Sequence, residues 1–394
     1  MVANQIHPHR ESLRIALAGM LALSIAMGIG RFSFTPILPM MQSDGSLTLT
    51  LGGWLASSNY LGYLIGGMTA RFFLHKPIVF MRTALCLVIA TTLWMGLVNH
   101  YKAWLALRLL SGVASAWVLV SVSSLCMPRL TCTPRIASLI FTGVGNGISL
   151  TGLVCLGLVM LDMTASTAWV TIGLISMLIG LAIWPVFSEQ QFSGPVTQPT
   201  PAHTKTEPTK PLSATKTQQR ILIWCYGISG FGYIIPATFL PAQAREILGD
   251  TPLFGLAWPV FGMASSVMVF FGGMLSARWG RIKTWMIAHL VMAVGVAIPT
   301  VWPGLSGILV AALCVGGTFV AVTLIAMQHA QAVLGPEAPA MMVKLTTAYA
   351  TGQILGPIFI SMLYGNMNLA LWIGAVALIF SSWMLSRLPI DARG

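Results

Sequence analysis

Two arginines lie inside long apolar runs of this 394-residue sequence. Arg31 interrupts residues 15–41, and Arg108 lies in a run that covers about 101–127. An arginine at the centre of a membrane-spanning helix costs about 3 kcal/mol on insertion scales, so it is kept mainly where it faces a cavity or a partner. None of the nine acidic residues falls within an apolar run. Neither arginine therefore has a side-chain counter-ion on these runs.

Anion binding is the chemistry that suits an uncompensated buried guanidinium. A carboxylate would accept two parallel hydrogen bonds from its planar fork. We therefore predict that Arg31 and Arg108 bind the carboxylate of a small organic anion or zwitterion. Two other interpretations stay open: each arginine bonds to helix carbonyls, or Arg108 extends to the outer membrane surface.

Further polar residues are predicted to reach the depth of the arginines. At a rise of 1.5 Å per residue, Arg31 lies roughly 15 Å and Arg108 roughly 10 Å from the outer ends of their runs. Asn59 and Tyr60 lie about 14 Å into the run at about 50–70. Tyr63 adds another orienting group, and Tyr233 and Gln353 could form the opposite wall. The predicted substrate site is Arg31, Arg108, Asn59, Tyr60, Tyr63, Tyr233 and Gln353.

The sequence indicates no catalytic or metal chemistry. It contains no recognisable nucleophile–base pair, phosphate-binding loop or metal-ligand cluster, so we expect no enzyme activity, no cofactor and no metal. The six cysteines lie in or beside apolar runs without a C-x-x-C pair, as inert small apolar side chains do. His289 and His329 lie near the ends of two later runs, where either could carry a coupling proton.

The elements that must position these residues are membrane-spanning helices. The chain is 56% hydrophobic and 8% charged, with a mean hydropathy of +0.83, whereas soluble domains are about 25% charged. A span needs about 20 apolar residues. Apolar runs cover 15–41, 50–70, 83–101, 101–127, 136–161, 163–187, 221–244, 251–277, 284–336 and 345–386. The last two runs hold two spans each, turning at Pro303–Gly304 and near Gly365–Asn366.

These runs predict an all-α membrane protein of twelve transmembrane helices in two six-helix halves, residues 1–187 and 221–394. Between the halves, residues 188–220 are rich in Thr, Pro and Gln and are expected to form a polar linker. If the N-terminus is cytoplasmic, 17 of the 21 Lys and Arg residues face the cytoplasm, with Lys102 and Arg245 outside. This asymmetry predicts a multi-pass protein of the bacterial inner membrane with both termini cytoplasmic. It also explains the net charge of +12 without a nucleic-acid partner.

The two halves repeat one another. Gly66-x-x-x-Ala70-Arg71 recurs as Gly273-x-x-x-Ala277-Arg278, 207 residues later (273 − 66 and 278 − 71). Parallel repeats of six helices joined by a cytoplasmic linker are the layout of the major facilitator superfamily. The second copy, which continues through Gly280 and Arg281, resembles the superfamily pattern G-x-x-x-D-R-x-G-R-[RK].

In that family this loop locks the cytoplasmic side while the transporter is open to the outside. The resemblance implies a gating role for Gly66, Arg71, Gly273, Arg278, Gly280 and Arg281. Ala70 and Ala277 stand where the family has aspartate, so we expect a weaker or differently built lock. The alternative is that these arginines only set the membrane topology.

The stretches Gly28–Pro39 and Trp54–Tyr63 resemble the YbfB/YjiJ branch of the superfamily. The resemblance implies the major facilitator fold, a central cavity and alternating access. The favoured function is secondary-active transport of a small organic anion or zwitterion by a monomer in the lipid bilayer. Two alternatives stay open: efflux of amphipathic drugs, and a non-transporting membrane sensor with the same fold.

Overall fold

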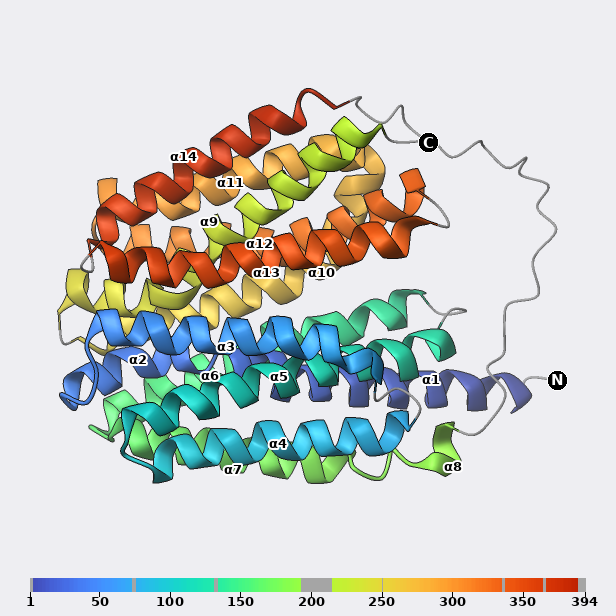
Figure 1. Ribbon diagram of the computed structural model, residues 1–394. Helices are drawn as coiled ribbons and strands as arrows, with labels where there is room; N and C mark the ends of the chain where they lie inside the picture. The colour runs from blue at the N-terminus through green and yellow to red at the C-terminus, as the bar shows by residue number, and fades with distance from the viewer. Residues whose placement is uncertain are drawn as a thin grey trace.

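The computed structural model is a bundle of long helices that run back and forth along one direction (Figure 1). It describes residues 3–72, 76–130, 134–192, 215–249, 251–334, 337–363 and 366–388. The helices of the first half are α1 (Ala3–Leu23), η1 (Ser24–Arg31), α2 (Phe34–Ser43), α3 (Leu49–Thr69), η2 (Ala70–Phe72), α4 (Pro77–Leu97), α5 (Tyr101–Leu125), η3 (Met127–Leu130), α6 (Pro134–Met160), α7 (Ala165–Ile183) and α8 (Glu189–Phe192). Together α1, η1 and α2 form one crossing of the bundle.

The second half repeats the order of crossings. Its helices are α9 (Lys216–Leu248), η4 (Pro252–Leu256), α10 (Ala257–Trp279), α11 (Arg281–Val301), α12 (Leu305–Leu334), α13 (Ala338–Met362) and α14 (Met367–Leu385). Helix α1 begins and helix α14 ends at the same end of the bundle, which we call the terminal end (Figure 1). We call the opposite end, where α2 joins α3, the far end.

Ten helical segments in the described part of the chain are long and apolar enough to span a membrane. Helices α3 and α13, which are not among these ten segments, complete the twelve predicted crossings. They carry the polar residues Asn59, Tyr60 and Gln353 among many small ones. The two helices pack against each other across the boundary between the halves. These two polar-residue-bearing crossings therefore lie where a transport site is expected.

The turn at Pro303–Gly304 is confirmed, since Gly304 has a φ of +149° between α11 and α12. Several helices begin before their apolar runs: α1 begins at Ala3 instead of 15, and α13 at Ala338 instead of 345. The start of the third crossing at residue 83 was wrong: α4 begins at Pro77 and includes Arg82. The Arg82 guanidinium donates to the Trp184 carbonyl at 3.2 Å and lies 4.7 Å from the centre of that indole ring. A charged residue satisfied in this way does not end a helix.

The predicted linker, residues 188–220, is helical at both edges. Residues Glu189–Phe192 form α8, and α9 begins at Lys216. Thr215 and Gln218 form a capping box that fixes this start, because each side chain accepts from the other residue's backbone N–H. Residues 193–214 lie outside the described part of the chain, so the linker prediction is untested there.

Hydrogen bonds join the two halves from the middle of the bundle to its far end. Each runs from one six-helix half to the other, at 2.7–3.1 Å: Thr35–Ala237, Pro39–Arg245, Thr50–Ser361, Ser57–Ile354, Tyr60–Thr238 and Ser149–Pro259. Helix α2 packs on α9, α3 on α13 and α6 on α10 across the same boundary. The halves are therefore held together at the far end.

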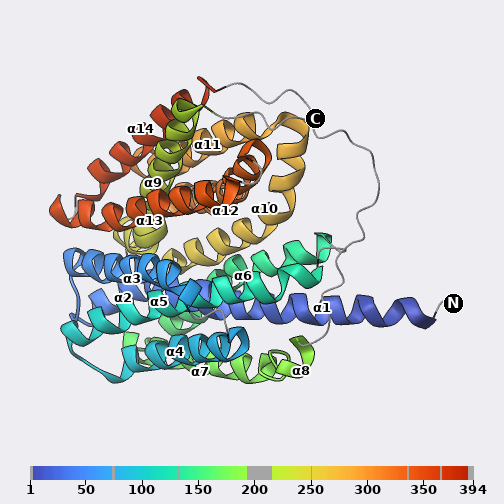
Figure 2. The same ribbon diagram turned by 45° about the vertical axis from the view of Figure 1, so that its right-hand side comes forward.

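Toward the terminal end the halves diverge (Figure 2). Two crevices open between them there. One, of about 610 Å³, lies between the last turns of α3 and α5 and the first turns of α13. The other, of about 600 Å³, lies between η3 and the start of α6 on one side and α10 and α12 on the other. Two further hollows between the halves, of about 420 Å³ and 580 Å³, lie at the far end. The hydrogen bonds that join the halves there nevertheless mark the far end as the closed side and the terminal end as the open side.

Candidate functional site

The first crossing changes its helical geometry at its centre, where Arg31 lies. The chain is α-helical to Leu23, π-helical over η1, and α-helical again from Phe34. Gly28 allows η1 to approach α6 closely, because a Cβ at this position would lie 2.4 Å from the Cα of Gly147 on α6. Only glycine permits this approach. Single π-helical turns are rare and occur frequently at functional sites.

Arg108 satisfies the carbonyls at the end of η1. The last carbonyls of a helix lack intrahelical partners and need other donors. Arg108 donates from Nη1 to the Gly30 carbonyl at 3.1 Å and from Nη2 to the Arg31 carbonyl at 2.8 Å. Ser111 also donates to the Gly30 carbonyl, at 2.7 Å. Asn59 in turn donates from Nδ2 to the Arg108 carbonyl at 2.9 Å.

These contacts match the carbonyl-bonding interpretation of Arg108, and they differ from the predicted clamp. Both terminal nitrogens of its guanidinium face backbone oxygens, and the group lies 5.2 Å from the centre of the Phe34 ring. A substrate carboxylate would have to displace these bonds. We therefore propose that Arg108 and Asn59 hold the backbone that carries Arg31, instead of contacting substrate.

Arg31 has a different environment. Its side chain is only 3% exposed, and Nη2 donates to the Oε1 of Gln353, on α13 of the other half. Its Cζ lies 4.0 Å from the centre of the Tyr63 ring, 5.1 Å from Tyr60 and 5.2 Å from Phe32. Its Nε has no hydrogen-bond partner among the described residues. The charge is thus held by a neutral amide and three aromatic rings.

The opposite wall begins at Gln353, as predicted, and continues as a stack of rings. Gln353 donates from Nε2 to the Tyr233 hydroxyl. The Tyr233 ring stacks on Phe319 at 5.2 Å and on Tyr349 at 5.5 Å between ring centres. Tyr349 stacks in turn on Tyr226, at 4.5 Å. Gln353 and Tyr233 are thus joined to Arg31 in one hydrogen-bonded chain across the halves.

Of the seven predicted site residues, the structure brings Arg31, Tyr60, Tyr63, Tyr233 and Gln353 together around one guanidinium. Sequence reasoning missed Thr238, whose hydroxyl shares a 3.0 Å hydrogen bond with Tyr60. It also missed the rings of Phe32, Phe319 and Tyr349. The sequence did contain a signal for Thr238. This residue lies three positions before Pro241, the counterpart of Pro39 in the first repeat, so it belongs to the equivalent part of the first crossing of the second half.

Of the two histidines proposed as proton carriers, His289 adjoins the ring stack through Trp285, whose ring centre lies 6.0 Å from that of Tyr226. The His289 Nε2 contacts the Ser229 hydroxyl and accepts from the Trp285 indole N–H, both at 2.9 Å. These three residues belong to α9 and α11, within the second half. His329 lies near the end of α12 and is buried. A role in proton coupling stays a prediction for both.

The predicted gating loops have a clear geometric feature at one residue. Gly280 has a φ of +84° between α10 and α11, a conformation that favours glycine, which explains that position of the motif. Gly66 packs against α5, where a Cβ would lie 2.4 Å from the Val113 carbonyl oxygen. Arg278 is exposed at the end of α10, and the side chain of Arg71 is not among those that the structure describes. Gating by these residues stays a prediction.

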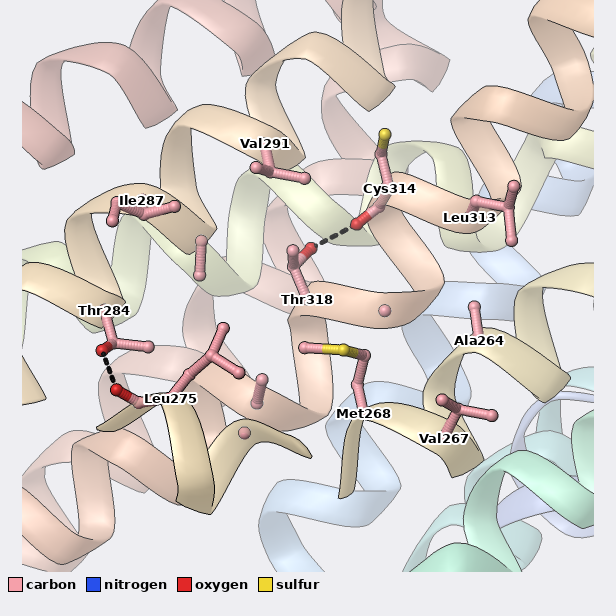
Figure 3. Close-up of a pocket in the computed structure, with 14 residues that line it drawn as sticks. Ala264, Val267, Met268, Leu275, Thr284, Ile287, Val291, Leu313, Cys314 and Thr318 are labelled. Carbon is pink, nitrogen blue, oxygen red and sulfur yellow. Dashed lines mark hydrogen bonds between the residues drawn. The ribbon is translucent and has the colours of Figure 1, made fainter. Parts of the chain in front are cut away.

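Another cavity, of about 340 Å³, lies within the second half among α10, α11 and α12 (Figure 3). Its two hydroxyls donate to carbonyls: Thr318 to Cys314 at 2.6 Å and Thr284 to Leu275 at 3.3 Å. The rest of its lining is alanine, glycine and apolar side chains, several of them exposed on the helix surface. It offers no polar group for a charged substrate.

The comparisons with known proteins agree with this architecture. The family model described as "Uncharacterised MFS-type transporter YbfB" matches residues 23–386. The chain belongs to this family of major facilitator transporters. The match includes every residue of the Arg31 site and the two crevices at the terminal end.

Relatives and solved structures extend the match along the chain. The uncharacterized MFS-type transporter YcaD of Escherichia fergusonii is 23% identical over 96% of both chains. The uncharacterized MFS-type transporter YceJ of Bacillus subtilis is 24% identical over 69% of both. The nucleoside transporter NupG has the same fold, with a TM-score of 0.68 at 13% identity over 96% of this chain and 100% of NupG. The structure of a NupG mutant gives a TM-score of 0.70 and covers 95% of this chain and 99% of the mutant chain.

Proposed function

We propose that this membrane transporter carries a small organic anion or zwitterion by secondary-active alternating access, and that Arg31 binds the anionic group. One observation carries the proposal: Arg31 is a buried cation between the halves whose described partners are all neutral. A buried charge without a counter-charge is costly. A substrate carboxylate would supply the counter-charge and match the guanidinium fork with two hydrogen bonds.

The position of Arg31 links anion binding to movement of the halves. Arg31 belongs to the first half, and its hydrogen-bond partner Gln353 belongs to the second. An incoming carboxylate competes with Gln353 for the same guanidinium, so binding alters a contact that joins the halves. Alternating access then requires the bonds at the far end to break as the crevices at the terminal end close.

The orientation of the cycle follows from the basic residues. With 17 of 21 Lys and Arg residues on one side, we propose that the terminal end faces the cytoplasm. The observed conformation is then inward-open. An amphipathic cation would be repelled by Arg31, which favours anion transport over efflux of cationic drugs.

A thermal-shift screen of carboxylates, amines and neutral metabolites on the purified protein tests this function. A ligand at 100 times its Kd stabilises the folded state by about 2.7 kcal/mol. We expect carboxylates to raise the Tm of the wild-type protein and to leave Arg31→Gln unchanged. Arg82→Gln is the matched control, because that arginine also contacts a carbonyl and a ring but lies within the first half. It should respond like the wild type.

Two outcomes would contradict the proposal. One is an equal Tm shift by carboxylates in the wild type and in Arg31→Gln, which would make Arg31 structural. The other is a response to amines alone, which would favour cation transport. Counterflow of the best ligand in proteoliposomes then distinguishes a transporter from a membrane sensor, because a sensor binds without exchange.

A further inference from the structure

The crevice between α3, α5 and α13 leads toward Arg31. We call it the α3–α13 crevice. Tyr63 lines it, and the centre of the same ring lies 4.0 Å from the Arg31 Cζ. The crevice holds about 610 Å³, within the range of about 300–1,000 Å³ of small-molecule pockets. A ligand that displaced the Tyr63 ring from Arg31 would extend directly into this space.

The lining of the α3–α13 crevice is apolar. Its larger side chains, apart from Tyr63, are Leu64, Met68, Leu119, Val120, Met342 and Val343. None of its lining residues is charged. Three of its four Ser and Thr residues, Ser123, Ser124 and Thr347, donate their hydroxyls to carbonyls on their own helices, at 2.8–3.1 Å, and the fourth is Thr346. Hydroxyls used in this way do not bind a polar ligand strongly, so the crevice suits an apolar group.

The charges around the site limit the ligand to a single negative charge. A zwitterion would bring an ammonium group, yet none of the nine acidic residues lies within an apolar run. A dicarboxylate would need a second cation, but the terminal nitrogens of Arg108 bind backbone carbonyls. Either extra charge would be desolvated without a partner, which is strongly unfavourable.

We propose that the substrate is an amphipathic monocarboxylate: its carboxylate binds Arg31, and its aromatic or aliphatic body fills the α3–α13 crevice. This inference rests on the proposed function and narrows it from small anions and zwitterions to one class. The Tyr63 ring is the boundary between the two parts of the site. Methionines at 68 and 342 allow the crevice to adapt to bodies of different shape.

A series of phenyl-substituted acids tests the inference. Benzoate, phenylacetate, 3-phenylpropionate and 4-phenylbutyrate carry the same charge on a body that grows by one CH₂ at each step. We expect Kd to fall by about fourfold per CH₂ that enters the crevice. Octanedioate and phenylalanine should bind at least tenfold more weakly than 4-phenylbutyrate, about 1.4 kcal/mol. The corresponding phenylalkyl alcohols and amines measure non-specific partition into detergent.

Gly67→Leu provides the structural test. Gly67 lines the crevice, and a Cβ there would meet nothing within 4 Å, so a new side chain can enter the space without a clash. We expect this variant to bind 4-phenylbutyrate about tenfold more weakly or worse, about 1.4 kcal/mol, and to bind benzoate normally. Gly157→Leu on α6 is the matched control, because a Cβ there also meets nothing within 4 Å. It should bind both acids like the wild type.

The outcomes separate this inference from the proposed function. If every acid binds equally and only Arg31→Gln abolishes binding, the anion site stands and the crevice proposal is wrong. If Gly67→Leu binds 4-phenylbutyrate like the wild type, the crevice is again excluded. Stronger binding of octanedioate or phenylalanine overturns the restriction to one charge. If none of the acids binds and amines do, the proposed anion transport fails as well.

Discussion

Replacing Gln353 by glutamate places a carboxylate beside Arg31 without changing the size of the side chain. In the wild type, the Oε1 of Gln353 accepts from Arg31 and its Nε2 donates to the Tyr233 hydroxyl. A glutamate at this position would still accept from Arg31. Its other carboxylate oxygen would accept from the Tyr233 hydroxyl, which reverses the direction of the wild-type hydrogen bond. The variant Gln353→Glu therefore contains its own counter-ion, in the position that we propose for the substrate carboxylate.

The size of the effect follows from the geometry. Unit charges about 4 Å apart attract by about 4 kcal/mol at an effective dielectric constant of 20. Burial of the new carboxylate removes part of this gain, so we take about 2 kcal/mol as the net advantage over the neutral amide. An external carboxylate must then compete with the internal one. Its Kd should rise by about thirtyfold, since each 1.4 kcal/mol is a factor of ten.

Calorimetric titration of the two proteins with the best carboxylate from the screen measures this change. The ligand-free Tm of Gln353→Glu should also exceed that of the wild type, because the internal ion pair replaces the missing substrate. Gln353→Leu is the control that removes the contact with Arg31 and supplies no anion, so it should retain carboxylate binding. Wild-type affinity in Gln353→Glu would refute the assignment of Arg31 as the anion site.

Three other predictions follow from the same contacts. Arg108→Gln should lower the free energy of unfolding by about 3 kcal/mol, because it loses charged hydrogen bonds to two carbonyls, and a denaturation titration measures this. In Gly145→Val a Cβ would lie 2.4 Å from the Gly262 carbonyl oxygen, so overpacking at the α6–α10 contact should reduce uptake by about tenfold or more at normal expression. A reporter active only in the periplasm should be silent after Gly394 and active when inserted beside Lys102.

The sequence predicts the fold well because a membrane restricts it. Apolar runs between basic loops allow few structures other than spanning helices, so the crossings and their order are predicted. Helices α1 and α13 nevertheless begin twelve and seven residues before their apolar runs. One error in the predicted helix boundaries arises at a charged residue whose side chain is bonded to another residue within the bundle. Arg82 was treated as a boundary, although a carbonyl and an indole ring accommodate it inside α4. A single sequence does not show such partners.

The site was predicted less completely. Residue type and depth brought Arg31 and Tyr60 to one level, with Gln353 predicted in the opposite wall, and the structure joins Arg31 to Gln353 by a hydrogen bond. The same reasoning favoured carboxylate binding by Arg108 beside the carbonyl-bonding alternative, because the π-helical turn of η1 was not foreseen. That turn leaves carbonyls at Gly30 and Arg31 for Arg108 to bind. The helix faces that meet across the boundary between the halves can also be identified only from the three-dimensional fold.

Uptake of a radiolabelled monocarboxylate into proteoliposomes tests the central claim most directly. Wild type, Arg31→Lys and Arg31→Gln should be compared at equal amounts of inserted protein. Because the guanidinium supplies both charge and a planar fork, we expect a large loss for lysine and abolished uptake for glutamine, with apparent affinity reduced by about a hundredfold or more. Uptake by Arg31→Gln at the wild-type rate would contradict the account, because the anion would then be bound elsewhere.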